Sequence, residues 1–461
     1  MVAGAEVVEM GQAALFVGEP DEVLEERRRA LHEQRRVQAQ SQAPRLVEPD
    51  RKQIELRPQD LDALLPLSHR ARSVWAVVER LDVRRFYEPI KARGSQAGRP
   101  CTDPKVLVAL WLYATCEGVG SAHEVERLCK EHDAYRWICG GVPMNYHTLS
   151  DFRSAHMEAL DELLTQLIAV LMQEGLVVLK RVAQDGTRVR ASAGAGSFRR
   201  RQRLEDFVTA AREQVEAVKT QANEAIDTQR SARRKAAQHR AASDRAERVQ
   251  RALEELERIE QQRDAMTGGH QPKGEPRAST TDPEARKMKM GDGGFRPAYN
   301  AQLATDTESR VIVGAALTAE GTDYAQSAPM IEQVEKRTGK KLDEVLLDGG
   351  YVSKEAVDTI SEHSVTMYAP LPERKGTPDP LAIKPQDSAA MRALKERMGS
   401  DAGKAIYKER AATAETVNAD LKTWRSLDRF LVRGTRKATC VLLWNVLAYN
   451  TLRWLALTAG S

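Results

Sequence analysis

The sequence has 461 residues, enough for about three domains of roughly 150 residues each. Its 70 Lys and Arg residues nearly balance its 66 Asp and Glu residues, which leaves a formal net charge of +4. Hydrophobic residues make up 41% of the chain, so it can bury a core, and wholly disordered, collagen-like and disulfide-scaffold proteins are excluded. Aromatic residues make up only 5%, so base stacking is not expected to dominate any binding of nucleic acid.

No segment is expected to span a membrane or to direct secretion. The most apolar stretch, residues 440–455, contains Asn445, Asn450 and Arg453 and is shorter than the roughly 20 apolar residues of a membrane span. It therefore predicts a buried helix. The N-terminus lacks the basic start of a signal peptide, and together these features predict a cytoplasmic protein.

The five cysteines are odd in number and include no CxxC pair, which favours reduced thiols. Cys129, His132 and Cys139 could together ligate zinc, but buried thiols on helices are the simpler interpretation.

The N-terminal third of the chain predicts a flexible arm followed by a helical domain. Residues 1–45 are polar and rich in Gln, with a possible helix at residues 21–36. Residues 46–174 contain helix-start signals at Asp103-Pro104, at Ser121 and at Asn145, the last of which opens a helix expected over residues 146–175.

Glycine turns separate these predicted helices, and the last helix begins with polar residues. This succession is typical of a helix-turn-helix DNA reader, in which His147 and Arg153 would contact DNA. An ordinary helical bundle has the same pattern, so both interpretations stay open.

An α/β domain is expected over residues 175–455, with a helical insertion and loop at residues 197–290. Residues 204–264 contain no Gly or Pro and carry apolar residues in alternating steps of four and three, which predicts a coiled coil or a helical hairpin. The segment 228–251 has eight basic and two acidic residues. It is either a solvated face or a surface that grips phosphates through Arg233, Arg234 and Lys235.

Without the insertion, the predicted order is three strands as a meander and then alternating helices and strands. This order matches the ribonuclease-H-like α/β fold. Fold alone does not give function, so the functional argument depends on acidic side chains.

Three carboxylates stand where this topology can bring them together. Asp185 is predicted at the end of the first strand, Asp348 at the end of the strand after the first helix, and Glu415 on a helix over residues 404–423. Converging carboxylates suit Mg²⁺, and two such ions can activate water or a 3′-hydroxyl against a phosphodiester. Each acid alone has a simpler interpretation. Asp-Gly is a common sequence in turns, so either aspartate could be an ordinary turn residue. On the helix, Glu409 and Asp420 are alternatives to Glu415 as the third acid.

The stretch from Tyr407 through Arg410 to Glu415, followed by Lys422, resembles the Tyr-Arg-Glu-Lys signature of bacterial insertion-sequence DDE transposases. VAQDGTRVRA, STTDPEARKMKMGDGGFRPAYNAQLATD, LLDGGYVSKEA, GRPCTDPKVLVALWLYA and YHTLSDFR resemble further segments of that family, closest to its insertion-sequence-1182 branch. The likeness covers about residues 50–455. One departure is that four residues, not three, separate Arg410 from Glu415.

The resemblance implies a transposase in which Asp185, Asp348 and Glu415 are the catalytic residues and the ligands of two Mg²⁺ ions, with Mn²⁺ as a possible substitute. On a regular helix Tyr407, Glu415 and Lys422 fall within about 80° of one another. Lys422 would then touch a phosphate beside the metals.

Tyr407, Arg410, Lys422 and Arg425 are therefore expected to contact DNA, although surface solvation is the alternative for such residues. The expected partner is double-stranded DNA, both terminal inverted repeats and target. Strand transfer at two ends predicts a homodimer or a higher oligomer on the DNA. Two alternatives remain: a ribonuclease-H-like nuclease, and a transposase-derived DNA-binding protein without activity.

Overall fold

The computed structural model describes residues 21–40, 60–94, 100–224, 229–265, 274–372 and 379–459. The chain divides into two compact units, Met1–Pro58 and Gln59–Ser461. In the first unit the described part is one helix, α1 (Asp21–Gln40), which extends beyond the predicted residues 21–36. The rest of the predicted arm lies outside the described residues.

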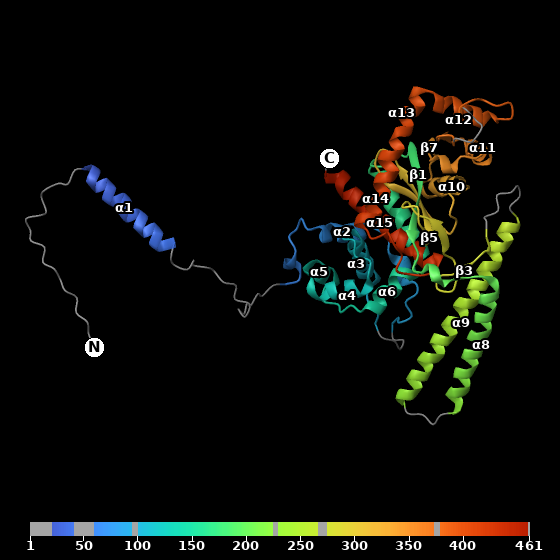
Figure 1. Ribbon diagram of the computed structural model, residues 1–461, viewed down its shortest axis with the longest axis horizontal. Coiled ribbons are helices and arrows are strands. Elements are labelled where there is room, and N and C mark those ends of the chain that lie inside the picture. Colours follow the sequence, from blue (N-terminus) through green and yellow to red (C-terminus); the bar gives the residue numbers. More distant parts are fainter. Residues whose placement is uncertain are drawn as a thin grey trace, which may run out of the picture. The chain divides into compact units, whose positions relative to one another are not determined.

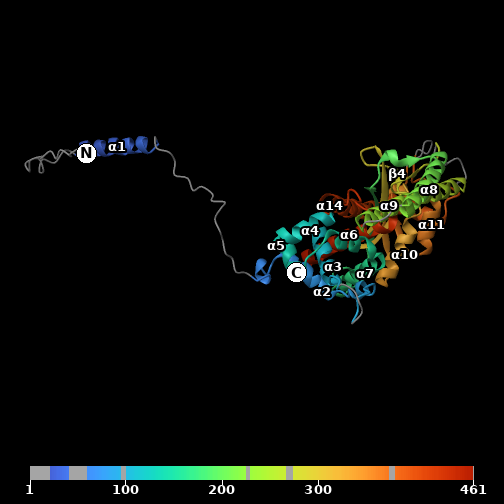
Figure 2. The same ribbon diagram turned by 90° about the horizontal axis from the view of Figure 1, so that it is seen from below.

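The second unit begins with the helices of the predicted N-terminal domain (Figure 2). They are α2 (Arg70–Arg80), α3 (Pro104–Cys116), α4 (Ala122–Glu131), α5 (Asp133–Cys139), α6 (Tyr146–Ala155) and α7 (Met157–Gln173). The predicted start signals are confirmed: Asp103, Ser121 and Asn145 each accept a hydrogen bond from a backbone N–H in the first turn of α3, α4 and α6.

The single helix predicted over residues 146–175 is wrong. It breaks at His156, whose backbone (φ −112°, ψ 49°) is not helical and separates α6 from α7. The His156 ring packs against Phe86 and Phe152, with centroids 5.3 and 4.8 Å away, so aromatic packing holds the break.

One mixed sheet forms the centre of the α/β part. Its strands are β1 (Arg181–Arg190), β4 (Arg286–Lys289), β5 (Phe295–Asp306), β6 (Ile312–Thr318), β7 (Glu344–Leu346) and β8 (Thr366–Tyr368). The order is β4-β5-β1-β7-β8, with β6 also paired to β5. β1, β5 and β6 form the predicted antiparallel meander, whereas β7 and β8 extend the sheet in parallel. This order is the one expected for the ribonuclease-H-like fold.

Helices α10 (Ser327–Thr338) and α11 (Lys354–Glu362) connect β6 to β7 and β7 to β8. The long apolar helix α15 (Thr435–Ala459) packs against α3, α6 and α7 and also against β6. Within the described residues α15 is the one helix long and apolar enough to cross a membrane, but 72% of its most apolar window is buried in the protein. The predicted buried helix at residues 440–455 is therefore confirmed.

Asn450 is a polar residue inside this apolar helix, and its hydrogen bonds explain its presence there. Its Oδ1 accepts from the Ile312 N–H at 2.9 Å, and its Nδ2 donates to the Ile312 carbonyl at 2.8 Å. The side chain thus satisfies the backbone where β6 begins, which an apolar residue could not do.

The insertion forms a hairpin of two long helices, α8 (Arg201–Glu224) and α9 (Gln229–Asp264), which lie side by side (Figure 1). At its root the short strands β2 (Phe198–Arg199) and β3 (Ala278–Ser279) pair with each other. Leu204, Ala252, Leu256 and Ala278 form a small apolar cluster there, separate from the main core. The described part of the predicted apolar stripe is therefore the contact face of a helical hairpin.

The C-terminal helical run differs from the continuous helix predicted over residues 404–423. Helix α12 (Ala389–Gly399), which the sequence did not predict, precedes α13 (Asp401–Arg410). A π-helical turn, η6 (Ala411–Glu415), then joins α13 to α14 (Thr416–Trp424). A π turn accommodates one extra residue in a helix, so it accounts for the four residues between Arg410 and Glu415. Angles computed for a regular helix do not apply across it.

Candidate active site

Asp185 lies within β1, not at the end of the strand as predicted. It pairs with Leu303 on β5, and β1 continues to Arg190. On the other side of β1, Ala183 is in parallel register with Leu346 of β7. Asp185 is two residues further along β1, and Asp348 is two residues past Leu346, just beyond the end of β7, so the register brings these two acids close together.

The absent side chain of Gly186 explains why β1 can continue. A Cβ at this position would lie 2.1 Å from Oδ1 of Asp323 and 2.4 Å from Nε2 of Gln302. Asn300 and Gln302 both donate hydrogen bonds to Asp323, at 2.8 and 2.6 Å. Glycine is therefore required because a buried polar cluster occupies the space beside it, not because the backbone turns.

The same cluster holds the loop that carries Asp348. Tyr351, three residues later, is fully buried, and its hydroxyl donates to Gln302 of β5. Asp348 caps the short helical turn Gly349–Tyr351 by accepting from the Gly350 N–H at 2.7 Å. Both contacts fix the direction in which the Asp348 carboxylate points.

Arg410 joins the two aspartates. Its Nη2 donates to Asp185 Oδ1 at 3.0 Å and lies 3.8 Å from Asp348 Oδ2. The side chain of Asp185 is 16% exposed and that of Asp348 is 37% exposed. Burial raises the pKa of Asp185, as does the nearby Asp348, while Arg410 opposes the shift.

Asn418 holds the second oxygen of Asp185, and the sequence did not single it out. Its Nδ2 donates to Asp185 Oδ2 at 2.9 Å, while its own Oδ1 is buried without a hydrogen-bond partner among the described residues. The available signal was its spacing: Asn418 follows Glu415 by three residues and so shares a helix face with it.

Glu415, the third predicted ligand, stands at the end of the π turn with its side chain exposed. No contact recorded for the described residues joins it to Asp185 or Asp348, and no cluster of three or more acidic, His or Cys side chains arranged to hold a metal occurs among them. Glu415 is nevertheless one helical turn from Asn418, which contacts Asp185.

Tyr407 and Lys422 interact electrostatically with the acids. Both are half-buried, and burial raises the pKa of Tyr407 and lowers the pKa of Lys422. Asp185 acts on both of them electrostatically: it raises the pKa of Lys422, against the effect of burial, and adds to the rise at Tyr407. The structure thus gathers Tyr407, Arg410 and Lys422 around the aspartate pair.

Two other residues predicted to bind DNA are largely enclosed within the protein. Arg153 is 8% exposed, lies over the Trp111 ring and donates to the carbonyl of Gly120. Arg425 donates to the carbonyl of Cys116 and pairs with Asp420 at 3.2 Å. These contacts tie Arg153 and Arg425 to neighbouring segments of the protein, and the contact of either residue with DNA stays a prediction.

The remaining predicted DNA contacts lie away from the aspartates. His147 is exposed at the start of α6, where its ring packs on Tyr146. Arg234 and Lys235 lie on α9 of the hairpin, whereas the side chain of Arg233 is outside the described residues. Cys129 and Cys139 are free thiols, and no zinc cluster with His132 is found within the described residues.

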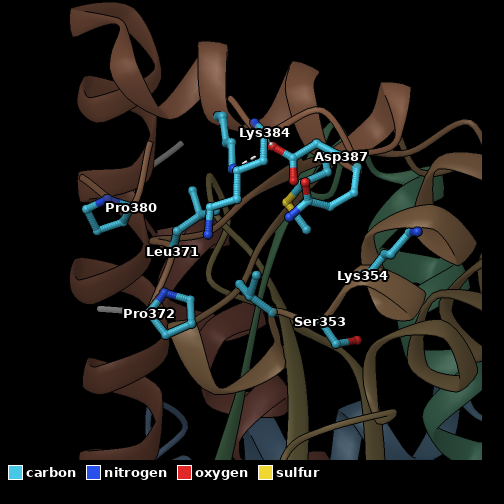
Figure 3. A pocket seen from close by; sticks show the side chains of 11 residues that line it. Ser353, Lys354, Leu371, Pro372, Pro380, Lys384 and Asp387 are labelled. Atoms are coloured by element: carbon cyan, nitrogen blue, oxygen red, sulfur yellow. Dashed lines mark hydrogen bonds and ion pairs between the residues drawn. The ribbon is translucent and has the colours of Figure 1, made fainter. Parts of the chain in front are cut away.

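A hollow of about 260 Å³ lies beyond the Asp348 loop, lined in part by Ser353, Lys354, Leu371 and Pro372 (Figure 3). The buried Lys395 on its wall donates to Asp387 at 2.6 Å and to the Ala382 carbonyl at 2.7 Å, so its charge is already balanced. The described lining contains neither Asp185 nor Asp348, so this hollow is separate from the carboxylate pair.

Comparisons with known families match two segments of the chain. Residues 269–451 match the family described as Transposase DDE domain, and residues 59–155 match the Transposase domain (DUF772). The two matches indicate a DDE transposase family. A family of this kind implies DNA binding and nuclease or transposition activity, generally dependent on a divalent metal, and Asp185 lies outside both matched segments. No curated protein and no solved structure matches the chain.

The donor set can be tested against a hard divalent cation. Such ions prefer several oxygen ligands and retain waters. Asp185 and Asp348 converge on one guanidinium nitrogen, and the buried Oδ1 of Asn418 is a further oxygen without a partner in the described structure. The aspartate pair fits the cation of a DDE transposase, with a positive group already held between its carboxylates.

Proposed function

We propose that this chain is a DNA transposase that cleaves phosphodiesters at element ends and joins the freed ends to target DNA. The observation that carries the proposal is the convergence of Asp185 and Asp348 on Arg410, at the edge where β1 and β7 lie in register. The phosphates of a nucleic-acid backbone are negatively charged, and the cationic side chains of Arg410 and Lys422 beside the aspartates would bind them.

Asp185, Asp348 and Glu415 would hold the metal ions. Bound Mg²⁺ or Mn²⁺ supplies charge neutralisation at the phosphate and lowers the pKa of the attacking water or hydroxyl. The chain's own contribution is to keep two carboxylates close together, which costs electrostatic energy unless a cation lies between them. Glu415 completes the set from the helix face that also carries Asn418, one turn away.

Tyr407, Arg410 and Lys422 would position the DNA phosphates beside the acids. Recognition of the inverted repeats would fall to the N-terminal helices, where the exposed His147 begins α6. Whether these helices act as a helix-turn-helix or as an ordinary bundle is decided by footprinting of the element ends. We expect two or more protomers on the DNA and action in the cytoplasm, and we place the chain in the insertion-sequence-1182-like branch.

The decisive experiment compares the wild type with Asp348→Asn on duplexes that carry the inverted repeats flanking the gene. The wild type should nick these ends and join them to a target plasmid when Mg²⁺ is present. Asp348→Asn should bind the same duplexes and leave them intact, because an amide lacks the negative charge with which the carboxylate holds the metal. Cleavage by the variant would refute the assignment.

The same assay separates the alternatives. A branched-DNA nuclease of this fold would cut by DNA structure and would show no joining to target. If the chain is a transposase-derived DNA-binding protein without catalytic activity, the wild type would bind the ends and leave them uncut at every Mg²⁺ or Mn²⁺ concentration.

A further inference from the structure

At the root of the α8–α9 hairpin, arginine side chains surround a hollow of about 330 Å³. Its lining consists of Phe198, Arg199, Arg200, Arg203 and Arg277. The residues come from β2, from the start of α8 and from the position just before β3. Phe198 is 5% exposed, with Lys287 of β4 over its ring, so another cation lies close behind the hollow.

The positive charges at this hollow are only partly balanced. Arg200 pairs with Glu275 at 2.6 Å, and both side chains are more than half exposed. Within the described part of the chain no ion pair is recorded for Arg199, Arg203 or Arg277, and the lining includes no acidic side chain. Three uncompensated guanidinium groups around one hollow repel one another, and an anion between them relieves that repulsion.

Arg199 supplies a donor with an unused hydrogen bond. One of its terminal nitrogens donates to the Gly196 carbonyl, which holds the side chain in place. Its Nε is buried and has no hydrogen-bond partner in the described structure. The Arg199 guanidinium is thus held at the hollow, and no ion pair among the described residues balances its charge.

The position of the hollow favours a phosphodiester as that anion. From Asp185, β1 runs on to Arg190 over about 16 Å at roughly 3.3 Å per residue, and β2 begins eight residues later at Phe198. Duplex DNA carries one charge per about 1.7 Å, so a duplex of that length presents roughly nine phosphates. A duplex engaged at the aspartates and extending towards the hairpin would bring a flanking phosphate to these arginines.

We propose that this arginine-lined hollow is a binding site for a backbone phosphate of duplex DNA outside the cleavage site. It is distinct from the basic face of α9 around Arg234 and Lys235. The proposal depends on the proposed function in one respect, that DNA is the ligand. It predicts contact without base specificity, because guanidinium–phosphate bonds carry no sequence information.

The test uses the full chain carrying Arg203→Gln together with Arg277→Gln. Lys336→Gln with Arg392→Gln is the control, because it makes the same change of charge at exposed positions on α10 and α12. Arg199 is left unchanged because its carbonyl contact shapes the loop. Circular dichroism and thermal unfolding verify that both variants fold. Binding to a duplex of unrelated sequence is measured by fluorescence anisotropy in EDTA over a range of NaCl concentrations, so catalysis plays no part.

The hollow variant should bind roughly tenfold more weakly at low salt, the scale of one charged hydrogen-bond pair. Its slope of log affinity against log salt should fall by about 0.9, the value for one lost phosphate contact, while the control keeps the wild-type slope. Equal slopes for the hollow variant and the control would overturn the site. Absence of DNA binding by the wild type would instead refute the proposed function.

Discussion

A Cβ added to Gly186 would lie 2.1 Å from Oδ1 of Asp323. The glycine is therefore a packing requirement of the sheet beside the candidate active site. Its neighbour Asp185 points to the other face of β1, towards Arg410 and Asn418. The Asp-Gly pair thus lets a strand carry an acid on one face and accept a buried polar cluster on the other.

Gly186→Ala should destabilise the protein because the methyl group must displace Asp323 or Gln302. Overpacking of this kind costs roughly 1–3 kcal/mol, and the cluster also fixes the Tyr351 hydroxyl. Gly194→Ala is the matched control, since a Cβ there meets nothing within 4 Å. Thermal unfolding should give a melting temperature several degrees lower for Gly186→Ala and one near the wild-type value for Gly194→Ala. Equal values would show that the cluster can move aside freely.

Asn418→Leu should impair metal use without unfolding the protein. The variant removes the donor that orients Asp185, and loss of such a supporting group commonly costs 10–100-fold in metal affinity or activity. We expect the Mg²⁺ concentration at half-maximal cleavage to rise by at least about tenfold. Thr416→Ala, an exposed change on the same helix, should leave that concentration unchanged. A purely structural role for Asn418 would lower the melting temperature without moving the Mg²⁺ requirement.

Arg410→Gln should strengthen the binding of Mn²⁺ to the protein alone. The guanidinium lies between two carboxylates, so its positive charge opposes an incoming cation. Its removal should lower the melting temperature without metal and increase the rise in melting temperature that Mn²⁺ produces. Lys408→Gln, on an exposed part of α13, is the control. A smaller Mn²⁺-induced shift in Arg410→Gln than in the control would show that Arg410 supports metal binding.

Sequence patterns predicted the strand order and the pairing of Asp185 with Asp348, because both follow from element order and strand register. They ended the first strand at Asp185, because Asp-Gly is a frequent turn pair and the cluster around Asp323, beside which β1 continues, comes from distant parts of the chain. The only sign of the π turn at residues 411–415 in the sequence was the spacing of Arg410 and Glu415, which are separated by four residues and not by the three of the family signature.

The roles of Arg153 and Arg425 depended on tertiary contacts that no local pattern records. Arg153 on α6 contacts the carbonyl of Gly120, 33 residues away, and Arg425, just after α14, contacts that of Cys116, 309 residues away. Basic character alone could not distinguish an arginine that ties helices together from one that faces DNA. Asn418 was missed for a related reason, since its contact with Asp185 joins residues 233 positions apart.

Asp282 should give the folded protein a measurable dependence on pH. It is fully buried where the chain returns from the insertion, and it accepts from the Tyr299 hydroxyl at 2.7 Å and from the Gly434 N–H at 3.0 Å. Its other oxygen has no partner among the described residues. Burial raises the pKa of Asp282 above the ordinary value of 3.8, which outweighs the two hydrogen bonds.

A carboxyl with a raised pKa in the folded state favours folding most when it is protonated. Its contribution is complete below the pKa of the unfolded chain and is lost as the pH rises through the higher pKa of the folded protein. Asp282→Asn keeps an oxygen for Tyr299 and Gly434 but cannot ionise. Urea unfolding midpoints measured from about pH 4 to neutral pH should therefore fall for the wild type relative to Asp282→Asn. Midpoints that change in parallel for the two proteins would show that the pKa of Asp282 is the same in the folded and unfolded states.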